Sequence, residues 1–172
     1  LLIIEHGHVA VLGDARDLLP TLTGGVALTD CTGKLIVPGF IDAHTHFVQT
    51  DVIGSHGRRL LDWLEDYTFP AERAFADAAH AREAALARNM RLIAGKAWMD
   101  RNCPAYLQDT AASSYADSAA LIARWHGRGR LQYAITPRFA PSSTPEQLAA
   151  AGRLARAHPD VHVHTHVAES QK

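Results

Sequence analysis

The sequence predicts an α/β fold built on a parallel sheet, and two observations carry that prediction. Over most of the chain, short apolar runs typical of strands alternate with segments whose composition or apolar spacing is typical of helices. The chain has 172 residues, of which 47% are hydrophobic and 20% charged, so it is long enough to bury a substantial core. The same composition excludes a disordered or collagen-like chain.

Composition also excludes several kinds of partner. No run approaches the roughly 18 consecutive apolar residues that span a bilayer, so we expect no membrane partner. The formal net charge is −1, so there is no basic excess of the kind that binds nucleic acid. Cys31 and Cys103 are too few for a disulfide scaffold and lack CxxC spacing, which favours a reducing, cytoplasmic compartment. Histidine is abundant, at 11 residues, and directs attention to metal chemistry.

Residues 1–37 are expected to form a small β-rich meander, because glycines separate its short apolar runs. Pro38-Gly39 marks a sharp break, after which Phe40–His46 is expected to be a short, buried strand. Leu1–Ile4 resembles a strand entered partway and has no signal-peptide pattern, so we expect the natural chain to begin earlier.

The remaining elements alternate between helix and strand. The Ala-, Glu- and Arg-rich composition between Trp63 and Arg88 predicts helix. Helical spacing of apolar residues predicts two later helices, and apolar runs bounded by turn residues predict three strands. The two helices are expected at 113–126 and 145–158, and the strands at 91–97, 131–139 and 161–167.

The first chemical signal is the pair His44 and His46. Residues two apart on a strand point the same way, about 6.6 Å apart, so both imidazoles could bind one metal ion. Asp42 would share that face and could support the ligands from outside. The alternative is a pair of polar side chains facing water, but a buried apolar strand has little reason to end in two histidines unless a ligand compensates them.

A second signal is the alternating run that contains His162, His164 and His166. These three span about 13 Å, which is too long for one ion without distortion. We therefore expect His166, at the carboxyl end of the strand, to be the ligand, and the other two to be interior residues or to support the ligands from outside. Glu169 follows three residues later and could move a proton from water activated by a metal; the alternative is a solvent-exposed loop carboxylate.

The strand that ends near residue 139 carries a third signal. Arg138 offers a planar fork of donors suited to a carbonyl or another planar acceptor. Phe139 offers a ring face for stacking. A surface arginine beside a core phenylalanine explains the same residues equally well.

Taken together, these motifs resemble the amidohydrolase superfamily and, within it, the guanine deaminases. The segment 37–46 looks like the first barrel strand of the superfamily with its HxH metal motif. Further segments resemble the guanine deaminases in order along the chain: 49–51, 61–64, 67–72, 99–102, 136–139 and 165–169.

The resemblance implies a distorted (β/α)8 TIM-like barrel with a small β-sandwich, to which residues 1–37 would contribute. It also implies one Zn²⁺ ion per subunit, a cytoplasmic homodimer, and hydrolytic deamination of guanine, a small-molecule substrate, to xanthine and ammonia. Matching by position, the metal ligands would be His44, His46 and His166. Glu169 would be the catalytic proton shuttle. Gln49, Arg138 and Phe139 would bind the purine.

The sequence also departs from the family pattern. We expect residues 38–172 to be the first portion of the barrel, without the later strands that supply a further metal His and Asp. Compared with the family, we also expect a βα unit to be missing near residues 85–88, so activity of this polypeptide alone is not expected. Two other interpretations stay open: an amidohydrolase deaminase acting on a related purine, a pterin or a triazine, and an incomplete, non-catalytic fragment of such an enzyme.

Overall fold

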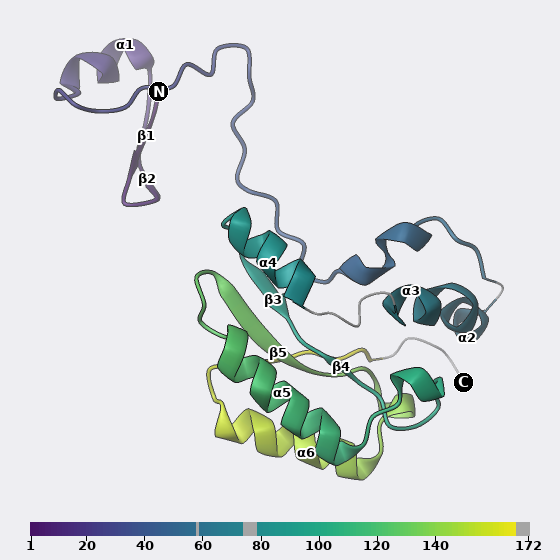
Figure 1. Cartoon of the computed structure of the whole chain (residues 1–172). Helices are drawn as coiled ribbons and strands as arrows, with labels where there is room; N and C mark the ends of the chain where they lie inside the picture. The colour runs from purple at the N-terminus through teal and green to yellow at the C-terminus, as the bar shows by residue number, and fades with distance from the viewer. Residues whose placement is uncertain (58, 74–78, 168–172) are drawn as a thin grey trace. The chain divides into compact units, whose positions relative to one another are not determined.

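A computed structural model describes residues 1–57, 59–73 and 79–167 of the chain (Figure 1). The chain divides into two compact units, Leu1–His44 and Thr45–Lys172, which are described separately below. Among the described residues, no helix is long and apolar enough to cross a membrane.

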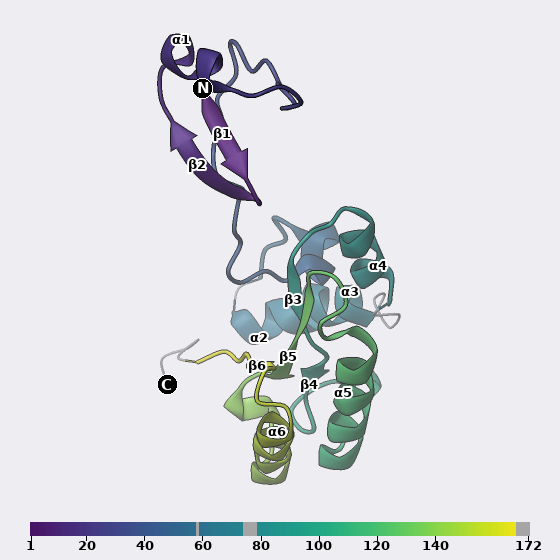
Figure 2. The same ribbon diagram turned by 90° about the vertical axis from the view of Figure 1, so that its left-hand side faces the viewer.

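The N-terminal unit contains one β-hairpin, shown in purple in Figure 2. Strands β1 (Leu2–Glu5) and β2 (His8–Leu12) pair antiparallel. His6 and Gly7 both have positive φ, at 50° and 79°, as expected for a two-residue hairpin turn that matches the strand twist. The helix α1 (Ala15–Leu18) and the 3₁₀ turn η1 (Leu19–Thr21) follow. The predicted meander is therefore represented by a single hairpin, and a β-sandwich is not shown.

The prediction of a buried strand over Phe40–His46 is wrong. These residues form neither strand nor helix, and the side chains of Phe40 and Ile41 are 98% and 91% exposed. A strand is stabilised by hydrogen bonds to a neighbouring strand, and no described strand pairs with this segment. The Asp42 carboxylate instead accepts a hydrogen bond from the His44 backbone N–H at 3.1 Å, which is a local turn interaction.

The predicted helical region between Trp63 and Arg88 is confirmed for the residues that the structure describes there, with one irregularity. Helix α2 (Leu60–Trp63) continues through a π-helical turn, η3 (Leu64–Thr68), into α3 (Phe69–Arg73). Pro70 lacks the N–H that a regular helix would use at that position, and the turn widens just before it. Helix α4 (Ala79–Ala87) follows and leads within a few residues into the sheet.

The sheet of the second unit is parallel and is organised around β5 (Leu131–Pro137). Strands β3 (Leu92–Ala94) and β4 (Ala97–Trp98) pair with its two ends, and β6 (His162–Val163) pairs with its middle. Between β3 and β4 the chain approaches β5 so closely that a Cβ on Gly95 would overlap the Ala134 carbonyl oxygen. Only glycine fits this position.

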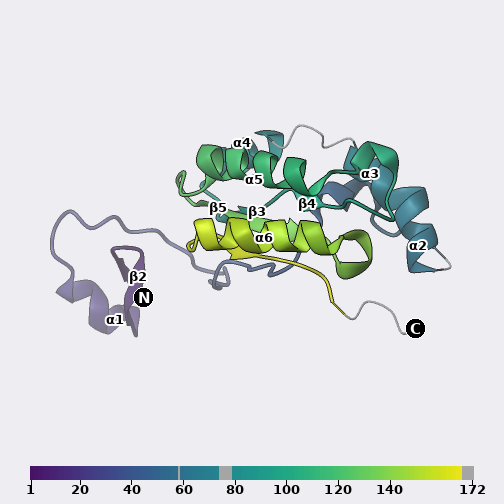
Figure 3. The same ribbon diagram turned by 90° about the horizontal axis from the view of Figure 1, so that it is seen from below.

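Helices α5 (Ala111–Trp125) and α6 (Pro145–Ala157) lie side by side on one face of the sheet (Figure 1, Figure 3). Thr110 and Thr144 cap their N-termini, each accepting a backbone N–H three residues ahead. Between the helices and the strands lies a hydrophobic core cluster: Trp98, Ile122, Tyr133, Ile135, Ala150, Ala151, Leu154 and Val161. The predicted α/β alternation is thereby confirmed for this unit.

Candidate functional site

The candidate site lies where the carboxyl ends of β5 and β6 meet the segment that starts at Thr45. His46 is the residue before the 3₁₀ helix η2 (Phe47–Val52), and its carbonyl accepts the Gln49 N–H at 2.8 Å. Beyond β6, an isolated bridge between Phe139 and His166 continues the parallel pairing. Two segments far apart in the sequence therefore present histidines at one end of the sheet.

His46 and His166 face each other through their Nε2 atoms, which lie 3.0 Å apart, with the rings stacked at a centroid distance of 5.1 Å. The Nδ1 atom of His166 lies 2.8 Å from the Arg138 carbonyl oxygen. Because a carbonyl only accepts, Nδ1 must carry the proton in this contact. The lone pair of His166 is then on Nε2, which is the tautomer that binds a metal from this side.

His44 completes a group of three possible ligands. One ring nitrogen from each of His44, His46 and His166 lies within 4.8 Å of the others. Two ligands at 2.0–2.1 Å from a tetrahedral ion lie about 3.3 Å apart, close to the 3.0 Å between the two Nε2 atoms. The donor set and its geometry therefore fit a small divalent cation such as zinc. Glu169 lies outside the described residues.

The other two histidines of the β6 region differ from each other. The ring of His164 is half-buried, with its centroid 5.9 Å from that of His166. His162 is exposed, and its Nε2 lies 3.1 Å from the Gln132 side-chain oxygen. The prediction that His162 is an interior residue is wrong, because the short strand β6 leaves this side chain at the surface.

Next to the histidines, Arg138, Glu72 and Gln49 form a connected polar network. Arg138 Nη1 donates to both oxygens of the Glu72 carboxylate, at 2.9 and 2.7 Å. Gln49 Nε2 donates to the Glu72 Oε1 atom at 3.1 Å. Arg138 is only 6% exposed, and its guanidinium lies 5.3 Å from the centre of the Phe69 ring. The buried cation is thus paired and stacked, which offsets the cost of removing it from water.

Glu72 is the functional candidate that sequence reasoning missed. A buried arginine requires an acidic partner, so a predicted role for Arg138 implies one. Nothing in the sequence says which of the 18 acidic residues it is, because the pair is separated by 66 positions.

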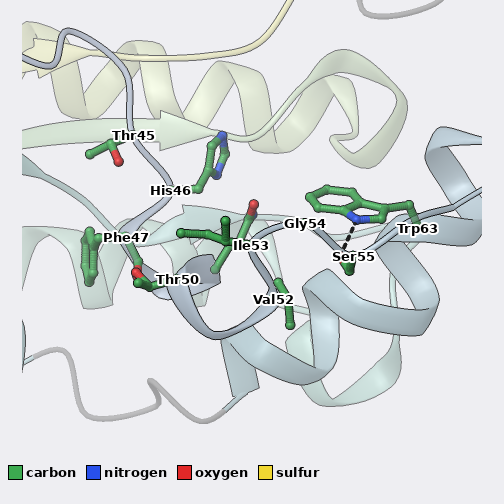
Figure 4. Close-up of a pocket in the computed structure, with 10 residues that line it drawn as sticks. Thr45, His46, Phe47, Thr50, Val52, Ile53, Gly54, Ser55 and Trp63 are labelled. Carbon is green, nitrogen blue, oxygen red and sulfur yellow. Dashed lines mark hydrogen bonds between the residues drawn. The ribbon is translucent and has the colours of Figure 1, made fainter.

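A pocket of about 320 Å³ opens beside these groups (Figure 4). His46, Gln49 and Trp63 line it, and Trp63 Nε1 donates to Ser55 Oγ at 2.8 Å across its wall. Phe139, the third predicted substrate residue, is half-buried and is not among the lining residues, although its backbone bridges to His166. The structure therefore brings Gln49 and His46 to one concave surface, with Arg138 linked to Gln49 through Glu72.

Comparison with known proteins identifies relatives of this chain. A model of the amidohydrolase family matches residues 35–86 and 70–172. Guanine deaminase from Escherichia coli (strain K12) is 44% identical over 204 residues, an alignment that covers 99% of this chain and 46% of the relative.

Solved structures agree with this finding. The E. coli guanine deaminase structure has a TM-score of 0.87 at 43% identity, covering 99% of this chain and 47% of the other. Guanine deaminase from Bradyrhizobium japonicum has a TM-score of 0.84 at 36% identity, covering 96% and 43%. A C. acetobutylicum guanine deaminase with guanine in its active site has a TM-score of 0.54 at 26% identity, covering 65% and 35%. The chain spans about half the length of these relatives.

Proposed function

The chain belongs to the amidohydrolase family, and on that premise we propose that the protein is a metal-dependent guanine deaminase that converts guanine and water to xanthine and ammonia. One observation carries the proposal: Arg138 connects the two halves of the site. Its carbonyl orients His166, and its guanidinium holds the Glu72–Gln49 pair. A metal-ligand group and a polar network suited to a flat heterocycle are thereby joined through one residue.

The proposed metal ligands are His44, His46 and His166, and the proposed ion is Zn²⁺, one per subunit. The tautomer of His166 and the 3.0 Å separation of the two Nε2 atoms support this assignment. When bound, such a cation supplies Lewis acidity that lowers the pKa of water towards about 7.

Glu169 is the proposed proton carrier. In the reaction, a water oxygen forms a bond to C2 of guanine, the bond from C2 to the exocyclic nitrogen breaks, and ammonia leaves. Glu169 would take the proton released by the attacking water and deliver it to the departing nitrogen. Its place three residues after His166 in the sequence supports this role.

Gln49, Arg138 and Phe139 are the proposed purine-binding residues. The guanidinium of Arg138 can donate to the acceptor atoms of the base, and Gln49 can satisfy a second polar position from the pocket wall. Phe139 would pack against the ring face. A base whose polar edge is left unmatched would be rejected by several kcal/mol, or about a hundredfold or more.

We also propose that residues 1–37 belong to a small β-sandwich and residues 38–172 to the barrel, without one βα unit near residues 85–88. Two observations support the missing unit: α4 ends at Ala87, only a few residues before β3, and the alignment with the E. coli relative extends over 204 residues although this chain has 172. A cytoplasmic homodimer is the proposed form of the protein.

The test is an assay of the full-length, metal-loaded protein with guanine. We expect xanthine and ammonia in equal amounts, loss of turnover after chelation, and recovery when Zn²⁺ is returned. Absence of xanthine from a folded, metal-loaded protein would overturn the proposed function.

A further inference from the structure

We propose that Glu72 is a positioning residue that sets which hydrogen-bonding pattern the pocket accepts. This inference rests on the proposed function. Glu72 would make the site select a purine that carries a ring N–H beside a carbonyl, and reject one that carries a bare ring nitrogen beside an amino group.

The carboxylate of Glu72 can only accept hydrogen bonds when it is ionised. Gln49 contacts Glu72 at 3.1 Å and must therefore present its NH₂ group to it, so the amide orientation of Gln49 is fixed by its partner. Among the described residues, no side-chain or backbone donor is hydrogen-bonded to the Gln49 Oε1 atom. Gln49 lines the pocket, and of its two polar side-chain atoms only Oε1, an acceptor, has no hydrogen bond to the described residues.

Glu72 also fixes the donor side of the site. Both hydrogen bonds from Arg138 to the carboxylate use Nη1, at 2.9 and 2.7 Å. The contact with the Phe69 ring holds the plane of the guanidinium. Within the described part of the chain, the other guanidinium nitrogens make no hydrogen bond, and they can only donate. One carboxylate thus aligns an acceptor from Gln49 and donors from Arg138.

Guanine complements this arrangement, because its N1–H donates and its O6 accepts. In 2,6-diaminopurine the same two positions are reversed: N1 accepts and the 6-amino group donates. The two bases have nearly the same shape, so discrimination between them must come from hydrogen-bond polarity. A glutamine at position 72 could donate as well as accept, and Gln49 could then turn its amide over.

The experiment measures binding of guanine and of 2,6-diaminopurine by equilibrium dialysis to the full-length, metal-loaded protein carrying Glu169→Gln, which removes the proposed proton carrier so that guanine is not consumed. In this background the protein with the wild-type residue at position 72 is expected to prefer guanine by more than about tenfold. Glu72→Gln should reduce this preference by about tenfold or more, while metal content stays unchanged. Glu72→Asp keeps the charge on a shorter side chain, so its preference for guanine should lie between that of the protein with Glu72 and that of Glu72→Gln. This variant also tests the inference if Glu72→Gln does not fold.

Asp109→Asn is the matched control. The Asp109–Lys96 pair is as close, and its carboxylate is nearly as buried, with Asp109 13% and Glu72 12% exposed. Glu72 is hydrogen-bonded to Gln49, which lines the pocket, whereas Asp109 bonds to Lys96, which does not. Loss of this pair should lower the melting temperature and leave the preference for guanine unchanged. A structural role for Glu72 would give the same pattern as this control.

An unchanged preference in folded, metal-loaded Glu72→Gln would overturn the inference, as would a wild type that binds both bases equally. Because binding is measured without the proposed proton carrier, it is independent of turnover. If Glu72→Gln reduces the preference for guanine while the protein with Glu169 intact forms no xanthine, the proposed function is overturned and the role of Glu72 is supported.

Discussion

Replacing Arg138 with alanine tests whether the buried Arg138–Glu72 ion pair can be removed without loss of metal binding by the histidine group. The substitution leaves the Glu72 carboxylate, which is 12% exposed, without two short hydrogen bonds from a cation. Breaking a buried pair by removing one partner costs about 3–5 kcal/mol, because the remaining charge is uncompensated. We expect the free energy of unfolding of the full-length protein to fall by that amount in urea denaturation.

The metal content should stay near the wild-type value in the same variant. The contacts that orient His166 are made to the carbonyl of residue 138, which alanine retains. Guanine turnover should therefore fall much more than bound zinc, as measured by elemental analysis of the folded protein.

Two further variants sharpen this prediction. Arg138→Met combined with Glu72→Gln removes both charges at similar volume and should recover much of the lost stability. Arg59→Ala removes the exposed Arg59–Asp62 pair and should leave the unfolding free energy close to that of the wild type. The reasoning is refuted if Arg138→Ala costs less than about 1 kcal/mol, or if it releases the metal as fully as His166→Ala does.

Other predictions concern the metal, the sheet and two buried groups. His46→Ala should lower zinc content at least about tenfold in the folded protein, and full retention of zinc would contradict the ligand assignment. Gly95→Ala places a methyl group against the Ala134 carbonyl and should destabilise the protein by about 3 kcal/mol or more in urea, whereas a near-wild-type midpoint would contradict the close approach. Burial raises the pKa of Tyr133, so the folded state holds that proton more tightly than the unfolded one. Its contribution to stability should be complete below about pH 10 and decline above it, and the decline should be weaker in Tyr133→Phe when unfolding is followed against pH. Burial, with the nearby Asp109 and Asp100 charges, raises the pKa of the Cys103 thiol, so iodoacetamide should modify it more slowly at pH 8 in the native protein than in urea; equal rates would contradict this.

The sequence predicts the second unit well because its signals are local. Helices α5 and α6 have apolar residues at helical spacing and a threonine cap, and β5 is an apolar run between turns. The segment 40–46 also has an apolar pattern, but it forms no strand. A strand needs a neighbouring strand to pair with, and the local sequence pattern does not show whether one is present.

The residues of the candidate site could also be predicted only in part. Residue type and position at the ends of predicted strands were enough to propose His46, His166 and Arg138. The contact between His46 and His166 joins residues 120 positions apart, so spacing alone could not establish it. Glu72 was missed because an acidic residue on a helix is usually solvated, and only packing reveals that this one faces a buried cation.

The π-helical turn η3 also determines where the following helix aims its side chains. A π turn contains one residue more than an α-helical turn, so every later position is rotated by about 100° relative to a regular helix. Glu72 follows this turn and reaches Arg138 from the rotated position. A one-residue deletion within 64–68 would swing the carboxylate around the helix axis and away from the guanidinium, even though no residue of the network had changed.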